Sequence, residues 1–113
     1  MLAKISFQVF GEKWTAYLYE PDTYEDKFGS DSEAITVSQK DTKLREMHFN
    51  AEDFSEAVVR HEIFHVYHTN QYIGSAHLKS EQMEEVGAEL FGIRGKEMIQ
   101  LSDKLYKYFK KEL

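Results

Sequence analysis

The chain has 113 residues, a length that corresponds to one domain with a modest hydrophobic core. It contains no cysteine, which excludes disulfides, cysteine-ligated zinc and thiol catalysis, and we expect a reducing compartment, the cytoplasm. The formal net charge of −6 argues against a general nucleic-acid-binding protein. No apolar run is long enough to cross a membrane, and the first ten residues alternate rather than resembling a signal peptide. We therefore expect no membrane partner.

The first half of the chain carries strand patterns. Apolar and polar residues alternate over 5–9, and an aromatic-rich run over 14–19 follows the turn sequence Gly-Glu-Lys, which predicts a β-hairpin. Residues 21–32, PDTYEDKFGSDS, are rich in turn formers and acids, and we predict a surface loop there. Two further short strands are expected over 35–38 and 44–49.

The pattern changes to a helical period after Asn50, which is expected to be the N-cap of a helix with acidic residues in its first turn. This helix is apolar on two sides over 51–70, which is typical of a central helix in the core. A second helix is expected over 81–91. A C-terminal helix is expected over 96–111, separated from the second by two glycines.

The central helix contains VVRHEIFHVYHTN over 58–70, in which HEIFH is the pattern H-E-x-x-H. His61 and His65 are separated by one helical turn and share a face, so both imidazoles can reach one metal ion. Neutral imidazole binds zinc at about 2.0–2.1 Å. Glu62 points roughly 100° around the helix from His61. It would therefore lie beside the ion, placed to take a proton from a water that zinc activates.

A catalytic zinc site needs a third protein ligand. The metzincin pattern requires Gly and then His after the second motif histidine, and His68 and Gln71 occupy those positions, so this class is excluded. The next expected helix carries Glu85 and Glu89 on one face, where one carboxylate could bind the metal and the other could hydrogen-bond a ligand histidine. Glu84 is a third candidate. A solvated acidic face is the alternative interpretation of all three.

H-E-x-x-H followed by a helix with E-x-x-A-[DE], here EVGAE over 85–89, resembles the gluzincin metallopeptidases. The order of strands, motif helix and glutamate helix is most similar to minimal gluzincins, such as the ImmA/IrrE-like group and small phage or mobile-element peptidases. The resemblance covers roughly 35–92, is specific at the motif, and implies a zincin-like fold. Here the second x position is Phe64, where the ImmA/IrrE-like group commonly has Gly. We also expect no helix-turn-helix beside the domain.

The resemblance also implies roles for single residues. One zinc ion per chain would be bound by His61, His65 and Glu85, with Glu62 as general base and Glu89 as the carboxylate behind a ligand histidine or as an alternative ligand.

Three residues are possible accessories of the site: His68, Tyr72 and His77. His68 lies one turn beyond the motif, and the other two follow the motif helix, where a Tyr or His often stabilises the oxyanion in gluzincins. His48, on the strand before the motif helix, is expected to be exposed or at a strand edge.

These expectations combine in one α+β, zincin-like metallopeptidase domain over 1–113. A small, mostly antiparallel sheet of three or four strands packs on the motif helix, followed by the glutamate helix and a C-terminal helix. The expected function is zinc-dependent hydrolysis of a protein or peptide substrate, which pairs in extended form with Ile35–Ser38. The alternatives are a catalytically silent zincin-fold module that binds or inhibits a partner protein, and a metal-free interaction domain. A bacterial or phage protein suits these features, and the sequence does not fix the oligomeric state.

Overall fold

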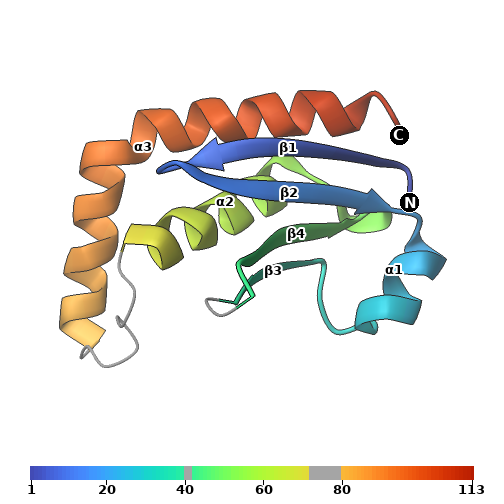
Figure 1. The fold of residues 1–113 in the computed structure, drawn as a ribbon, viewed down its shortest axis with the longest axis horizontal. Coiled ribbons are helices and arrows are strands. Elements are labelled where there is room, and N and C mark those ends of the chain that lie inside the picture. Colours follow the sequence, from blue (N-terminus) through green and yellow to red (C-terminus); the bar gives the residue numbers. More distant parts are fainter. Residues whose placement is uncertain (40–41, 72–79) are drawn as a thin grey trace.

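The fold combines a four-stranded sheet with three α-helices, which confirms the expected α+β class (Figure 1). The computed structural model describes residues 1–39, 42–71 and 80–113. In these residues the helices are α1 (Pro21–Phe28), the short 3-10 helix η1 (Ala51–Asp53), α2 (Glu56–Gln71) and α3 (Ser80–Lys110). Within the same ranges, no helix combines the length and apolar character that crossing a membrane requires.

The strands form one mixed sheet in the order β1-β2-β4-β3. β1 (Ala3–Val9) and β2 (Glu12–Tyr19) form the predicted hairpin, and β4 (Leu44–Asn50) pairs antiparallel with β3 (Ala34–Gln39). β4 pairs in parallel with β2, so the sheet is not purely antiparallel. A parallel pairing cannot be closed by a tight turn. Here the chain passes through α1 and β3 before it returns beside β2, which leaves β3 at one edge of the sheet.

The predicted surface loop over 21–32 is wrong, because α1 occupies most of this segment. Its proline lies in the first helical turn, where a missing N–H is tolerated and the fixed φ suits a helix. Tyr24 is fully buried, and the ring of Phe28 packs against it with centroids 5.1 Å apart. Aromatic residues four apart share a helix face. This spacing of aromatic residues indicates a helix, although the composition of the segment favours turns.

The start of the motif helix also differs from expectation. Asn50 caps η1 rather than α2, because its Oδ1 accepts a hydrogen bond from the backbone N–H of Glu52 at 3.0 Å. α2 begins after Ser55, whose Oγ accepts from the backbone N–H of Val58 at 3.2 Å. Both residues are good N-caps. The segment therefore contains two successive helical starts instead of one.

The two helices expected over 81–91 and 96–111 are one helix, α3, with both glycines inside it. α3 bends sharply near its middle, so that its N-terminal half passes the end of α2 and its C-terminal half lies beside β1 (Figure 1). Glycine in a helix interior is a recognised cause of such bends. A Cβ on Gly95 would lie 3.3 Å from the ring of Phe91, so this exposed ring would have to shift slightly to accommodate a larger residue.

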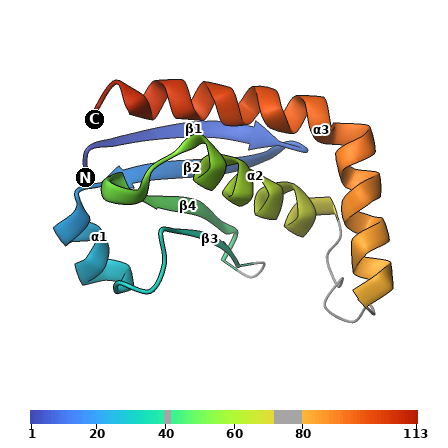
Figure 2. The ribbon, with the colours of Figure 1, turned by 180° about the vertical axis from the view of Figure 1, so that it is seen from behind.

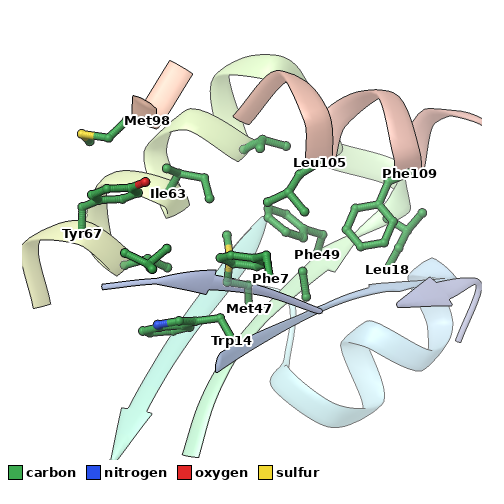
Figure 3. Close-up of a cluster of buried hydrophobic side chains, with 14 of the residues drawn as sticks. Phe7, Trp14, Leu18, Met47, Phe49, Ile63, Tyr67, Met98, Leu105 and Phe109 are labelled. Carbon is green, nitrogen blue, oxygen red and sulfur yellow. The ribbon is translucent and has the colours of Figure 1, made fainter. Parts of the chain in front are cut away.

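α2 lies across one face of the sheet (Figure 2), and apolar side chains of the sheet, α2 and α3 form the core there (Figure 3). On α2, Val59, Ile63 and Val66 are buried, whereas His61 and His65 are exposed on another side of the helix. The buried residues of this cluster include Phe7, Trp14, Leu18, Met47, Phe49, Tyr67, Leu105 and Phe109. The packing of α2 on the sheet therefore decides which side of the motif helix remains available.

Candidate metal centre

The two motif histidines lie together on the exposed side of α2. The Nε2 atoms of His61 and His65 are 3.1 Å apart, with ring centroids separated by 4.8 Å. Two imidazole nitrogens on one tetrahedral zinc, each at about 2.0–2.1 Å, would be separated by roughly 3.3 Å. The same distance also allows one ring to donate a hydrogen bond to the other. The side-chain arrangement thus fits two ligands of one metal ion with little adjustment.

Glu62 lies beside this pair in a buried position, with only 6% of its surface exposed. Its Oε2 accepts a hydrogen bond from Oγ1 of Thr36 at 2.8 Å. Thr36 belongs to β3 and is paired with Met47 of β4, a fully buried core residue, so its side chain lies on the face that α2 covers. A buried carboxylate without such a donor would be strongly unfavourable.

Sequence reasoning did not identify Thr36 as a functional residue, although it placed a strand over 35–38. The alternation within that strand puts Thr36 on the same face as Ser38. The sequence contains no signal that selects the hydroxyl which meets Glu62, since the two residues are 26 positions apart.

Two hollows lie on either side of Glu62, between α2 and the edge strand β3. One is lined by Glu33, Ala34, Ala57, Val58, His61 and Glu62. The other is lined by Ala34, Ile35, Thr36, Ser38, Glu62, His65 and Thr69. Both hollows are lined by Ala34 and Glu62, so they adjoin each other, and we call the two together the groove beside the motif. The strand expected to pair with a substrate therefore borders this groove.

The carboxylates expected to complete the site lie on the N-terminal half of α3. Glu85 and Glu89 have exposed side chains, as does Glu84. The side of α3 that meets α2 includes Gly87, where an added Cβ would lie 3.7 Å from the ring of Phe64. Among the described residues, no group of three or more His, Cys, Asp or Glu side chains is arranged to hold a metal ion. The structure brings the two histidines together, and the third ligand stays a prediction.

The accessory residues are placed only in part. Tyr72 and His77 lie outside the described residues. His68 is half-buried, and its ring stacks on that of Phe64 with centroids 5.6 Å apart. This contact gives His68 a packing role at the junction of α2 and α3, and its expected role in chemistry stays a prediction.

His48 is not exposed as expected, because only 6% of its surface is accessible. It lies on β4, which is an inner strand of the sheet. Its Nδ1 is 2.9 Å from the hydroxyl of Tyr19, and its Nε2 is 3.0 Å from a carboxylate oxygen of Glu46. Burial lowers the pKa of His48 below the usual 6.5, and the nearby Glu46 opposes this shift.

The comparisons with known proteins do not extend this picture. The chain matches no protein-family model, no curated protein and no solved structure. The resemblance to the gluzincins therefore rests on the motif and on the helix that follows it.

Proposed function

We propose that this protein is a zinc-dependent peptidase of the gluzincin type with a zincin-like fold. The observation that supports this most strongly is the arrangement on α2. His61 and His65 meet at their Nε2 atoms on the exposed side, and Glu62 lies next to them in the groove beside β3. Histidines that serve only packing would be expected to find partners in the core, as His48 does.

His61 and His65 would hold the zinc ion, with Glu85 as the proposed third ligand and Glu89 as the carboxylate behind a ligand histidine or as an alternative ligand. Imidazole nitrogens and a carboxylate oxygen are a donor set that zinc accepts in catalytic sites. When bound, zinc would lower the pKa of a water molecule towards about 7 and polarise the scissile carbonyl. α3 is the source of the proposed third ligand because it packs against the motif helix at Gly87 and Phe64. Glu85 and Glu89 lie about 160° around the helix from Gly87, so zinc binding by either would require this half of α3 to rotate towards α2.

Glu62 would act as the general base, accepting the proton of the attacking water and passing it to the leaving nitrogen. Its place between the two hollows of the groove supports this role, because a substrate in the groove would pass its carboxylate. β3 would bind the substrate in extended form by main-chain hydrogen bonds, which give affinity without demanding one side-chain sequence.

Metal analysis of the untagged protein, purified without added zinc and then titrated with zinc, tests the first part of this proposal. We expect about one zinc ion per chain, as for a mononuclear catalytic site. A stoichiometry near zero that zinc addition leaves unchanged would exclude every zinc-dependent function. Glu85→Gln and Glu89→Gln identify the third ligand, and Glu81→Gln, on the same helix but outside the predicted set, is the matched control.

Proteome-derived peptides test the second part. Glu62→Gln should retain zinc and the parent's unfolding midpoint but lose cleavage by about 10²- to 10⁴-fold, the usual contribution of a general base. Identical cleavage products and rates from the parent and Glu62→Gln would contradict the assignment of Glu62.

A catalytically silent zincin-fold module that binds or inhibits a partner protein is the second candidate. It is favoured by the hydrogen bond from Thr36, which gives Glu62 a role in holding β3 against α2 without any chemistry. This protein would bind zinc, cleave none of the peptides, and bind one partner tightly. The cleavage assay therefore separates it from the peptidase.

A further inference from the structure

We infer that Thr36 is a positioning residue for Glu62, so that the strand which would bind the substrate also orients the general base. This inference rests on the proposed peptidase function for its catalytic consequence. The contact itself is independent of that function, because it joins two residues of the described fold through one hydrogen bond of 2.8 Å.

The direction of the Thr36 side chain is set by the register of the sheet. Thr36 is paired with Met47, which is fully buried in the core, and the preceding pair, Ile35 with His48, lies on the opposite face. A shift of β3 by one residue would turn Thr36 away from α2. The position of the base is thus tied to the register of the edge strand.

The chemistry of threonine suits this task. Its branched Cβ restricts χ1, so the hydroxyl has few directions available to it. Glu62 has a longer and more flexible side chain, and the donor at Oε2 selects one arrangement of the carboxylate. Oε2 accepts the hydrogen bond of Thr36, and Glu62 lines both hollows of the groove, so its second oxygen would be the one to exchange a proton with a bound water.

In this arrangement, the same strand would align the bound peptide and orient the carboxylate of Glu62. A peptide that adds to β3 takes its register from the main chain of that strand, and the base takes its orientation from a side chain of the same strand. Small movements of β3 would shift the scissile bond and the hydrogen-bonded carboxylate of Glu62 in the same direction, while the backbone of Glu62 stays on α2. The distance between them would then be preserved better than if the base were held from a separate element.

Thr36→Val tests the inference, since it keeps the size and branching of the side chain and removes the hydroxyl. A quenched-fluorescent peptide that the parent cleaves is the probe. We expect kcat to fall by roughly 10- to 100-fold, the effect of losing a hydrogen bond to a charged group. KM and zinc affinity should stay close to the parent values, because the main chain of β3 and the two histidines are unchanged.

Thr36→Ser and Thr15→Val are the matched variants. Thr36→Ser retains the hydroxyl and should restore most of kcat, whereas a simple packing defect would make both substitutions at this position equally harmful. Thr15→Val makes the same chemical change on β2, where the hydroxyl meets Ser6 at 3.3 Å and not Glu62. It should leave kcat unchanged. A Thr36→Val protein with the parent's kcat, or a Thr36→Ser protein as impaired as Thr36→Val, would overturn the inference.

A second measurement keeps the inference testable if the parent cleaves no peptide. Scalar couplings of the Glu62 methylene protons in isotope-labelled protein report how many side-chain rotamers are populated. We expect one rotamer in the parent and in Thr36→Ser, and averaging over several in Thr36→Val. Inactivity of the parent with this NMR result would refute the peptidase and leave the positioning role standing. A single rotamer in Thr36→Val would refute the positioning role.

Discussion

The chain places histidines in two contrasting environments. His48, on β4, is buried, and both of its ring nitrogens contact hydrogen-bonding groups of the protein. His61 and His65, on α2, are exposed, and their Nε2 atoms lie 3.1 Å from each other beside a groove.

This contrast gives a way to distinguish a structural histidine from a candidate ligand. A ring whose two nitrogens are both engaged by side chains, as in His48, has no lone pair left for a metal ion. A pair of rings whose nitrogens converge at the surface retains that capacity. The number of histidines in the sequence does not separate these two cases. The partners of their ring nitrogens do.

The largest expected difference between the two histidine environments is in their effect on zinc affinity. His61→Ala or His65→Ala should weaken zinc binding by at least about 100-fold, because loss of a ligand exceeds the 10- to 100-fold effect of losing a residue that only supports a ligand. His48→Phe should leave zinc affinity unchanged. Competition titration against a chromophoric chelator measures all three. Weaker binding in His48→Phe alone would reverse the comparison.

The stability of the zinc-free protein should depend on His48 more than on His65. His48→Phe keeps an aromatic ring beside Phe28, which lies 4.7 Å away between centroids, but removes the partner of the Tyr19 hydroxyl. We expect the free energy of unfolding to fall by about 1–3 kcal/mol, the cost of leaving buried polar groups unpaired. His65→Ala, at an exposed position, should change it by no more than about 0.5 kcal/mol. Urea unfolding of the zinc-free proteins measures both, and equal losses would contradict the distinction.

The dependence of stability on acidic pH should test the role of His48. Its pKa is lowered in the folded protein by burial, so the unfolded chain binds the proton more readily. The contribution of neutral His48 is therefore complete above pH 6.5 and is lost as the pH falls from 6.5 towards the lower folded pKa. We expect the difference in unfolding free energy between the parent and His48→Phe to shrink over this range. A difference that is independent of pH would show that protonation of His48 is not linked to folding.

A further effect is expected at alkaline pH from Tyr19, the partner of His48. Burial, with Tyr17 and Glu46 nearby, raises the pKa of Tyr19 to about 12 from 10.0. The folded protein therefore retains the phenolic proton after the unfolded chain has lost it, and stability should fall between pH 10 and about 12. Tyr19→Phe should flatten this slope, as measured by urea unfolding at several pH values. An unchanged slope would assign the alkaline sensitivity to other groups.

Several elements were predictable because their signals are local. The alternating residues of 5–9 and the short runs at 14–19, 35–38 and 44–49 all lie within strands of the sheet. α1 was missed, since the residues that favour turns outweighed the spacing of Tyr24 and Phe28, which matters only when the helix packs on the sheet. α3 was divided at its glycines, although packing against α2 and the sheet retains a single bent helix.

The candidate site likewise combines contacts that follow from local sequence with contacts that follow from tertiary packing. The sequence alone determined that His61 and His65 would meet, because their separation of one helical turn fixes their proximity in any α-helix. The hydrogen bond of Thr36 to Glu62 and the burial of His48 depend instead on how the elements pack together. Those contacts join residues that are 26 and 29 positions apart, respectively, in the chain, through the packing of α2 on β3 and the pairing of β4 with β2. Such distant contacts depend on how the strands are ordered, which local periodicity does not encode.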